Sequence, residues 1–548
     1  MKEDYSNYKV LIADDSRLVV NSVNLAIKQL GFHSDNIHLA YKPSEVIALC
    51  KSVDMDIIIL DYNFNSNLNG HQIFYELSHY KSIKPTTIFV YVTGENALKT
   101  VKTILESGPD DYILKPFTQP AIKGRLRTII KKKNSLMPIY ERIEHNDFEQ
   151  AITECDDLLP FFPQHNLTIR QLKSKSLISL KRYEEAKQEY QQLLKENSYD
   201  WIKTSLANVM ILNDENEEAK NILEQVSDKK LNHLYHDEMS NVKAYENDVP
   251  AAIKHLKVAT MLLEAGLDRE LIIANLSISC DSYDEAFKYI KLYYTHNNNT
   301  FKVTDRTRLL YVQYFLYRCF SSNTLNNIDN ALLTVKSEID RLGRVESFSL
   351  QYDLVMSTIA LLKQDLGESY RLLSHVMSKL NDGNFDFYDM YHLVFVLEKM
   401  SFINQLPEYV LKCKSLIDES MHPNIMRSQI HMQNSQERRL KDKIDRSEEI
   451  KRDIRKLSSN PANFSKIIDL FCQLHEIFPK SIEFCLFFVK FVAVNEKQYQ
   501  GENSIHLMLN QCNRNLNELL SAEKIKKIGY EKIYSTALGN VNGYKKTA

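Results

Sequence analysis

The 548-residue sequence predicts two architectures in one chain: an α/β domain with a doubly wound parallel sheet, and then a longer all-α superhelix of helix pairs. Short β-branched runs alternate with helical stretches over the first 135 residues, which is typical of parallel strands buried on both faces. Glycine weakens helix interiors, and five of the 13 glycines fall within the first 124 residues. Beyond residue 140 an alanine-centred motif recurs about every 34 residues, the period of a helix–turn–helix repeat.

The α/β pattern predicts four strands and one clear helix. The expected strands are Lys9–Ala13, Asp56–Leu60, Thr87–Val92 and Tyr112–Leu114, and the expected helix covers Ser16–Leu30 before Gly31. In parallel sheets of this class the ligand lies at the carboxyl ends of the strands. The residues that directly follow the strands therefore define the candidate site.

Five polar residues follow these strands: Asp14 and Asp15, then Asp61, Thr93 and Lys115. Clustered carboxylates repel one another unless a cation lies between them, and a hard divalent ion with oxygen ligands suits such a cluster. We therefore expect Mg²⁺ at Asp14, Asp15 and Asp61. Asp61 is the expected nucleophile for a phosphoryl group, whose oxygens would meet Lys115 and the Thr93 hydroxyl.

The order of these residues resembles the receiver domains of two-component response regulators. The spacings are 46 residues from Asp15 to Asp61, 32 from Asp61 to Thr93 and 22 from Thr93 to Lys115, and the likeness covers about a quarter of the chain. The resemblance implies a flavodoxin-like fold, bound Mg²⁺, and a histidine kinase or phosphotransfer domain as the phosphoryl donor.

The resemblance also implies further roles by position. The backbone carbonyl of Asn63 is an expected metal ligand, and Tyr112 is the expected aromatic switch that moves inward when Thr93 is drawn toward the phosphoryl group. Asn63 and Glu95 resemble the pair found in chemotaxis-type receivers whose phosphoryl groups are short-lived, which implies fast self-dephosphorylation.

One departure lies in the loop that follows the phosphoacceptor. Receivers commonly carry Met-Pro and then Gly there, whereas the loop Asp61–Gly70 has no proline and is one residue longer. The departure concerns the geometry of the loop rather than the acidic cluster. A pseudo-receiver that keeps the fold without being phosphorylated is the alternative, and the five intact chemical positions favour a working receiver.

The body carries a motif of an aromatic or aliphatic residue, two polar residues and an alanine. Successive alanines are 35, 33, 33, 34 and 45 residues apart, and the residue four positions after each is apolar or aromatic, as a packed helix face requires. The alanines are Ala151, Ala186, Ala219, Ala252, Ala286 and Ala331. The motif resembles the tetratricopeptide repeat, which implies a concave surface that binds peptides or protein faces. A degenerate unit is expected at Leu366–Ser369, and beyond about residue 400 no further repeat is recognised.

The C-terminal part reads as two segments. We divide the chain into a receiver at 1–135, repeats at 136–420, a charged helical connector at 421–460 and a helical segment at 461–548. The connector carries a thin stripe of Leu440, Ile444, Ile450 and Ile454, which fits an exposed connecting helix or, alternatively, a coiled-coil or homodimer contact. The apolar run Phe484–Val494 is an expected buried helix.

Composition excludes several classes of function. A net charge of −2 leaves no basic field for nucleic acid, and Lys131–Lys133 reads as a solvated helix end. The eight cysteines form no C-x-x-C pair and read as buried thiols of a reducing compartment. No signal peptide or membrane span is visible, so a cytoplasmic protein is expected. His233 and His236 are three residues apart without a further ligand, and the body shows no catalytic motif, so no enzyme output is expected.

These observations converge on a response regulator with an N-terminal receiver and C-terminal tetratricopeptide repeats, resembling auxiliary regulators of the VieB type. Phosphorylation of Asp61 would switch the protein–protein contacts of the repeats, and the resemblance favours a kinase or another response regulator as the target. A constitutive pseudo-receiver scaffold and a nucleic-acid-binding output are the alternatives.

Overall fold

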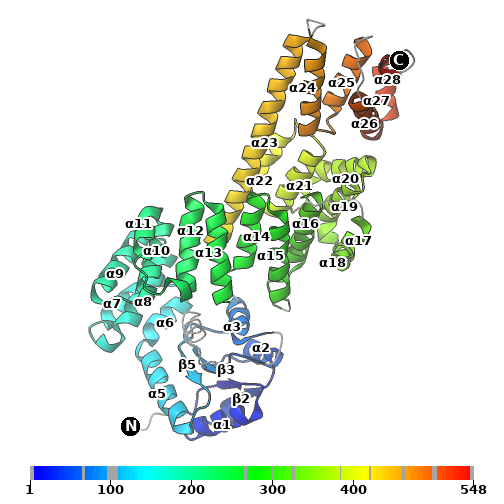
Figure 1. Cartoon of the computed structure of the whole chain (residues 1–548). Coiled ribbons are helices and arrows are strands. Elements are labelled where there is room, and N and C mark those ends of the chain that lie inside the picture. Colours follow the sequence, from blue (N-terminus) through cyan, green and yellow to red (C-terminus); the bar gives the residue numbers. More distant parts are fainter. Residues whose placement is uncertain are drawn as a thin grey trace. The chain divides into compact units, whose positions relative to one another are not determined.

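The computed structural model describes residues 5–64, 68–94, 109–263, 268–298, 300–321, 328–382, 384–418, 421–458, 463–495 and 503–542 (Figure 1). The chain divides into two compact units. The first comprises Met1–Arg269 together with His296–Lys302, and the second comprises Glu270–Thr295 and Val303–Ala548. The α/β domain and the first helix pairs belong to the first unit.

A five-stranded parallel sheet of order β2-β1-β3-β4-β5 forms the centre of the α/β domain. Its strands are β1 (Val10–Ala13), β2 (Ile37–Ala40), β3 (Ile57–Asp61), β4 (Ile88–Thr93) and β5 (Asp111–Leu114). The four expected strands are present. β2 was missed because it lies at an edge of the sheet, where three of its four residues are only half-buried and His38 interrupts the apolar run.

Helices cover both faces of this sheet, as a doubly wound fold requires (Figure 1). The helices are α1 (Arg17–Lys28), α2 (Pro43–Ser52), α3 (Gly70–His79) and α5 (Gln119–Ser135), with a short 3₁₀ turn at Ser34–Asn36. Alternate strand residues point to opposite faces, so Ile57 and Ile59 pack with Val23 of α1 and Leu126 of α5. Ile58 and Leu60 point to the other face, where they join Val46 of α2 and Leu77 of α3.

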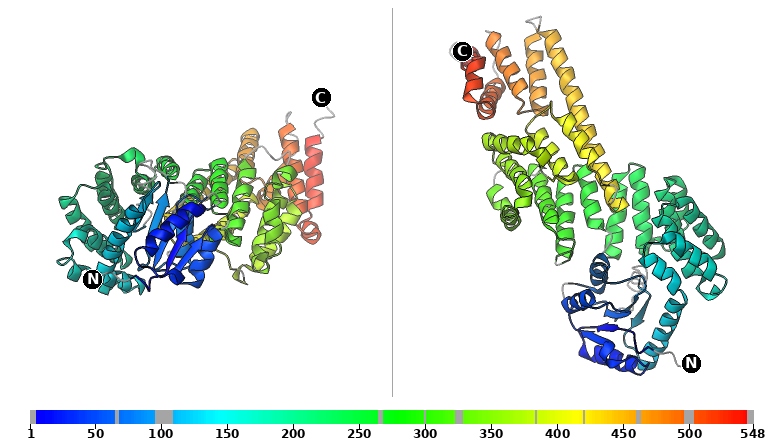
Figure 2. Two further views of the ribbon diagram at one scale, coloured as in Figure 1. Left: turned by 90° about the horizontal axis from the view of Figure 1, so that it is seen from below. Right: turned by 180° about the vertical axis from the view of Figure 1, so that it is seen from behind.

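The helix pairs of the first unit follow directly after α5 and stack side by side (Figure 1 and Figure 2). The predicted boundary at 135/136 falls between α5 and α6. The helices are α6 (Met137–Glu144), α7 (Phe148–Leu158), α8 (Asn166–Ser179), α9 (Tyr183–Glu196), α10 (Asp200–Leu212), α11 (Asn216–Leu223), α12 (His233–Tyr245) and α13 (Val249–Leu262), with 3₁₀ turns at Pro163–His165 and Lys229–Leu231. Ala151, Ala186, Ala219 and Ala252 lie in the second helix of each pair and are completely buried. Their small side chains allow the close approach of helices that the motif predicts.

The turn inside each pair repeats the same backbone geometry. A residue with positive φ lies five positions before each of the first five motif alanines, and the next amide donates to a carbonyl five residues upstream, as in the Schellman motif. The residues are Asn146, Lys181, Asp214, Asn247 and Asp281, with φ between 57° and 63°. Gln364 and Ser401 have the same geometry, five residues before Ser369 and Leu406. The degenerate unit at Leu366–Ser369 is thus a repeat, and one more repeat extends past residue 400.

The second unit contains the remaining repeats. Its helices are α14 (Arg269–Ser279, of which Arg269 belongs to the first unit), α15 (Tyr283–His296, of which His296 belongs to the first unit), α16 (Asp305–Ser321), α17 (Ile328–Leu332), α18 (Lys336–Leu342), α19 (Ser349–Leu362), α20 (Leu366–Ser378), α21 (Phe387–Lys399) and α22 (Leu406–Ser415), with 3₁₀ turns at Glu346–Phe348 and Leu380–Asp382. The parallel sheet followed by an all-α body of tetratricopeptide-like helix pairs confirms the predicted fold class.

The charged connector is a single helix, α23 (Pro423–Leu457), and its apolar stripe lies against the chain itself. Leu440, Ile450 and Ile454 are buried, the last two within the C-terminal core. The prediction of an exposed connecting helix is therefore wrong for Leu440, Ile450 and Ile454. The C-terminal helices cover the last two, whereas Ile444 is half-buried.

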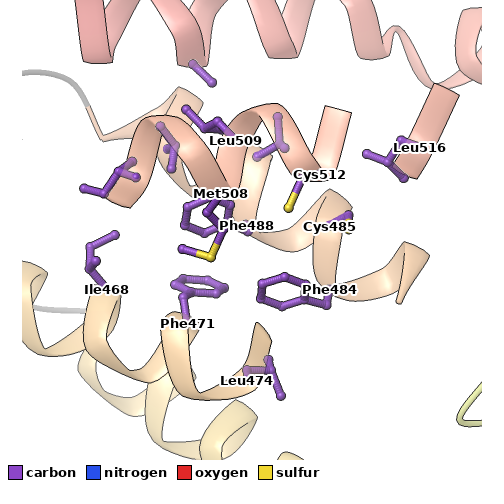
Figure 3. Close-up of a cluster of buried hydrophobic side chains, with 14 of the residues drawn as sticks. Ile468, Phe471, Leu474, Phe484, Cys485, Phe488, Met508, Leu509, Cys512 and Leu516 are labelled. Atoms are coloured by element: carbon purple, nitrogen blue, oxygen red, sulfur yellow. The ribbon is translucent and has the colours of Figure 1, made fainter. Parts of the chain in front are cut away.

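The C-terminal segment has its own apolar core (Figure 3). It consists of α24 (Phe464–Ile477), α25 (Ile482–Val494), α26 (Asn503–Leu519), α27 (Ala522–Ile528) and α28 (Tyr530–Asn542). Phe484 and Phe488 of α25 pack with Phe471 of α24, so the apolar run is the buried helix that the sequence predicts. All eight cysteines are free thiols, and six are buried, whereas Cys280 is exposed and Cys472 is half-buried.

Candidate functional site

The carboxyl ends of four strands bring the predicted site residues together. Asp14 follows β1, Asp61 ends β3, Thr93 ends β4 and Lys115 follows β5. The parallel register aligns these ends, because Ala13 pairs with Leu60 and Thr93 pairs with Leu114. Carboxylate oxygens of Asp14, Asp15 and Asp61 lie within 4.8 Å of one another, and they form the only group of three potential metal ligands among the residues that the structure describes.

Lys115 supplies the positive charge of this cluster. Its Nζ lies 2.7 Å from Oδ2 of Asp14 and donates a hydrogen bond of 2.9 Å to Oδ1 of Asp61. Both carboxylates are almost completely buried, whereas Asp15 is exposed. The other oxygen of Asp14, Oδ1, accepts a hydrogen bond of 2.9 Å from the Ser16 amide, which orients the carboxylate at the start of α1. One ammonium group therefore bridges two buried carboxylates.

The protonation of Asp61 and Lys115 reflects this arrangement. Burial raises the pKa of Asp61 to about 6, the Asp14 charge acts in the same direction, and the hydrogen bond from Lys115 opposes both. Burial acts to lower the pKa of Lys115, but the hydrogen bonds to Asp14 and Asp61 outweigh it and the pKa is raised. Near pH 7 the cluster therefore contains an ionised Asp61 next to a cationic Lys115, which is the state a carboxylate nucleophile needs.

Thr93 and Lys115 are also joined through the backbone. The amide of Lys115 donates a hydrogen bond of 2.7 Å to the carbonyl of Thr93, and the Thr93 side chain is completely buried. The Lys115–Pro116 peptide bond is cis. Both side chains are thus held at the same edge of the sheet as Asp61.

Tyr112 lies in β5, half-buried, and an arginine from α5 covers its ring. The guanidinium carbon of Arg125 is 5.4 Å from the ring centroid, and Arg125 makes two hydrogen bonds of 2.9 and 2.6 Å to the carboxylate of Asp111. Sequence reasoning missed Arg125, because a basic residue on a helix carries no signal for the strand that it contacts.

Gly70 ends the phosphoacceptor loop, and the sequence did not predict its close contact with the backbone of that loop. Its amide donates a hydrogen bond of 2.7 Å to the carbonyl of Tyr62. A Cβ at this position would lie 2.8 Å from the backbone oxygen of Asp61 and 2.9 Å from Cα of Tyr62, so a larger residue cannot fit without a shift of the backbone. The first turn of α3 is therefore in direct contact with the backbone of the phosphoacceptor. Asn63 has an exposed side chain, and Glu95 lies outside the described residues.

Two other sequence features have structural roles. His233 and His236 are both buried, and Nδ1 of His236 lies 2.9 Å from Nδ1 of His255 on the neighbouring helix. Burial, aided by His255, lowers the pKa of His236 to about 4.

In the run Lys131–Lys133, the last lysine is buried rather than solvated. Nζ of Lys133 lies 3.0 Å from the Asp110 carboxylate and 4.0 Å from the centroid of the Tyr140 ring. The prediction of a solvated run is therefore wrong for this residue.

Within the described ranges, every helix is either too short or too polar to cross a lipid bilayer.

Comparison with known proteins identifies the family of the N-terminal domain. Residues 10–127 match the family model described as the response regulator receiver domain. The transcriptional regulatory protein TrcR of Mycobacterium tuberculosis is 27% identical over 135 residues, which are 25% of this chain and 50% of that protein. A CheY homolog of Campylobacter jejuni is 28% identical over 122 residues, 22% of this chain and 92% of that protein. The cell cycle response regulator CtrA of Brucella ovis is 28% identical over 124 residues, 23% of this chain and 50% of that protein.

Two solved structures are also similar, at low identity. The match to the signal receiver domain of the NarL regulator of Mycobacterium tuberculosis covers 22% of this chain and 94% of the NarL chain, with 21% identity and a TM-score of 0.20. The match to one chain of the APC/C hetero-tetramer Cut9–Hcn1 covers 77% of this chain and 81% of the matched chain, with 12% identity and a TM-score of 0.33. The family match spans residues 10–127, and the chain spans only half the length of TrcR and CtrA. Residues 10–127 of this chain form a response regulator receiver domain.

Proposed function

We propose that this protein is a two-component response regulator in which phosphorylation of Asp61 switches the protein–protein contacts of the helical body. A histidine kinase or a phosphotransfer domain would supply the phosphoryl group. The observation that carries the proposal is the buried Asp61 carboxylate, with Lys115 at 2.9 Å and two further aspartates within 4.8 Å.

The chain's own residues divide the chemistry. A carboxylate oxygen of Asp61 attacks phosphorus and forms the acyl phosphate, while the bond from phosphorus to the donor's histidine nitrogen breaks and the electron pair leaves with that nitrogen. Lys115 stabilises the negative charge of the phosphoryl oxygens, and the Thr93 hydroxyl donates a hydrogen bond to one of them. Because the pKa of Asp61 is about 6, most of this carboxyl is ionised near pH 7 and ready to react.

The acidic cluster fits a magnesium ion by its donor chemistry. Asp14, Asp15 and Asp61 offer carboxylate oxygens close together, and the backbone carbonyl of Asn63 is the proposed fourth protein ligand. A bound Mg²⁺ would neutralise charge on the phosphoryl oxygens.

We further propose that Thr93 and Tyr112 form the switch. Movement of the Thr93 hydroxyl toward the phosphoryl group would leave space for the Tyr112 ring. Arg125 contacts that ring and is held by Asp111, so a change at Tyr112 would be felt by α5, which leads into the helix pairs. Asn63 and Glu95 resemble the pair of receivers with short-lived phosphoryl groups, and we propose fast self-dephosphorylation on that basis.

The repeats are the proposed output. Tetratricopeptide-like pairs stack into surfaces that bind peptides or protein faces, so a binding output is proposed rather than a catalytic one. The order of receiver and repeats resembles VieB-type auxiliary regulators, and on that resemblance we propose a kinase or another response regulator as the partner. The net charge of −2 argues against nucleic acid as the target.

The test is phosphorylation of the full-length chain by acetyl phosphate with Mg²⁺, followed on a phosphate-affinity gel. We expect a shifted band that is lost in Asp61→Ala and kept in Asp35→Ala, because Asp35 is an exposed carboxylate elsewhere in the same domain. Size-exclusion chromatography of the same samples reports whether phosphorylation changes a homodimer equilibrium. An unshifted wild type, with either acetyl phosphate or a phosphorylated phosphotransfer domain, would favour a pseudo-receiver scaffold that binds its partners constitutively.

A further inference from the structure

Helix α3 of the receiver contacts a segment that follows it by more than 200 residues in the sequence. His296–Lys302 belongs to the same compact unit as the receiver, although the helices on either side of it belong to the other unit. The contacts come from one face of α3: Gln72 binds the carbonyl of His296, and Glu76 accepts a hydrogen bond from the amide of Phe301. We call His296–Lys302 the docking segment.

One amide group connects the phosphoacceptor loop to the docking segment. Oε1 of Gln72 accepts a hydrogen bond of 2.9 Å from the Asn69 amide, and Asn69 returns one of 2.9 Å, so the two residues form the capping box of α3. Nε2 of the same Gln72 side chain donates a hydrogen bond of 2.7 Å to the carbonyl of His296. Any displacement of Asn69 therefore acts directly on the group that holds the docking segment.

Further along α3 the contact combines a polar and an aromatic interaction. The carboxylate of Glu76 is largely buried and accepts a hydrogen bond of 2.9 Å from the Phe301 amide. One turn later the His79 ring stacks on the Phe301 ring with centroids 3.7 Å apart and planes 7° from parallel. Lys302 lies with Nζ 5.6 Å from the Tyr75 ring centroid and pairs with Asp268 at 2.6 Å. Successive turns of α3 thus hold the docking segment.

The opposite end of this contact is the phosphorylation site. Gly70 is the first residue of α3 and directly follows Asn69, and it lies against the backbone of Asp61 and Tyr62. Its amide donates a hydrogen bond of 2.7 Å to the carbonyl of Tyr62. The Tyr91 hydroxyl donates a hydrogen bond of 3.3 Å to the Gly70 carbonyl and fixes the same turn to β4. The path from the Asp61 backbone to the docking segment therefore passes through Gly70, Asn69 and Gln72.

From these contacts we infer that α3 is the surface through which phosphorylation of Asp61 controls the helical body, by releasing the docking segment. This inference rests on the proposed function, since it needs a phosphorylated Asp61. A phosphoryl group on Asp61 has to enter where Lys115 now contacts the carboxylate directly, next to the Asp61 and Tyr62 backbone against which Gly70 lies, so it acts on the first turn of α3 and on Asn69. Loss of the Asn69–Gln72 pairing then weakens the bond from Gln72 to His296.

The experiment uses the full chain with beryllofluoride and Mg²⁺, a mimic of the phosphoryl group that binds at equilibrium. Hydrogen exchange of the Phe301 amide reports docking, because that amide donates to Glu76. In the wild type we expect the amide to exchange at least about fivefold faster with beryllofluoride than without, within the usual range of coupling between sites. By the reciprocity of linked equilibria, a variant with a weakened contact binds beryllofluoride about fivefold more tightly.

Gln72→Glu is the decisive variant. A glutamate at this position keeps an acceptor for the Asn69 amide, as in a common capping box, but loses the donor to His296. Glu76→Gln keeps an acceptor for the Phe301 amide and is expected to behave as wild type, whereas Glu76→Ala is expected to behave as Gln72→Glu. Ser78→Ala is the matched control on the same helix, because Ser78 is exposed and its hydroxyl bonds only to the Phe74 carbonyl of α3.

The two proposals fail in different ways. If acetyl phosphate labels Asp61 but the Phe301 amide exchanges equally fast with and without beryllofluoride, the inference is overturned and the proposed function stands. Slower exchange of the Phe301 amide in the presence of beryllofluoride also overturns the inference. So does a Gln72→Glu variant that binds beryllofluoride with the affinity of the wild type. If Asp61 takes no phosphoryl group from any donor, the proposed function is overturned and the regulatory role of α3 goes with it.

Discussion

Nζ of Lys115 lies 2.9 Å from Oδ1 of Asp61, and yet the pKa of Asp61 is raised to about 6 from its ordinary value of 3.8. Burial of the carboxylate therefore outweighs the contact with the lysine. The ionised form is the reactive one, so the receiver keeps its nucleophile charged at neutral pH at a cost to the stability of the fold. This balance leads to the first prediction.

Asp61→Asn is expected to stabilise the receiver at neutral pH. A carboxyl whose pKa is higher in the folded than in the unfolded state destabilises the fold increasingly as the pH rises from about 4 to about 6, because the folded state then binds more protons. We expect the variant to gain about 1–3 kcal/mol at pH 7.5 in the absence of Mg²⁺, and the gain to vanish near pH 4. Hydrogen exchange of the β3 and β4 amides measures the opening free energy. A variant that is less stable than wild type at pH 7.5 would contradict the burial argument.

Gly70→Ala is expected to destabilise the receiver and to slow its phosphorylation. The new Cβ would lie 2.8 Å from the Asp61 backbone oxygen, so either α3 or the phosphoacceptor strand has to move. We expect a loss of about 1–3 kcal/mol. Gly124→Ala in α5 is the matched control, because nothing lies within 4 Å of its Cβ position, and alanine there should stabilise the helix by about 0.5–1 kcal/mol. Thermal unfolding and the rate of labelling by acetyl phosphate test both variants. Equal effects of the two substitutions would show that the close approach of Gly70 has no importance.

Ala219→Leu is expected to disrupt one helix pair of the repeats. Ala219 is completely buried, so the larger side chain should cost about 1–3 kcal/mol through overpacking. Ala331, the motif alanine whose spacing departs from the period, is only half-buried, and Ala331→Leu should be tolerated. Urea unfolding followed by circular dichroism measures both changes. Similar stability of the two variants would count against the close packing at the motif alanines.

The repeats around α12 are expected to lose stability in mild acid through His236. Its pKa is lowered by burial to about 4, below the ordinary value of 6.5, so the unfolded state binds more protons between these values. The stability that the neutral ring contributes is complete above pH 6.5 and is lost as the pH falls toward 4. We expect a loss of about 1–2 kcal/mol between pH 7 and pH 5.

His236→Gln is expected to remove most of this pH dependence. Trp201, the only tryptophan of the chain, packs against the same core cluster as Tyr235, so its fluorescence in urea reports unfolding of this region. A wild type and a His236→Gln variant with the same pH dependence would assign the acid sensitivity to other groups.

The sequence alone was enough for the acidic site, because the chemistry follows from local order. Each of Asp14, Asp61, Thr93 and Lys115 comes directly after or at the end of an apolar run, and parallel strands deliver their ends to the same edge. The period of the alanine motif likewise identified the first five repeats, since each helix pair is a local unit. The repeat at Leu406 escaped notice because its signal is a positive φ at Ser401, a backbone property that the residue type does not reveal.

Contacts between distant segments were decided only by the tertiary structure. Nothing in the residues of α3 indicates that Gln72 and Glu76 bind His296 and Phe301, because hydrogen bonds to backbone atoms require no complementary residue type. The burial of Ile450 and Ile454 in α23 has the same cause: a thin apolar stripe predicts a contact, but not whether the partner is another chain or helices α24–α28. The sequence determined which groups could react and which segments repeat, whereas packing between segments far apart in the chain determined what the reactive site touches.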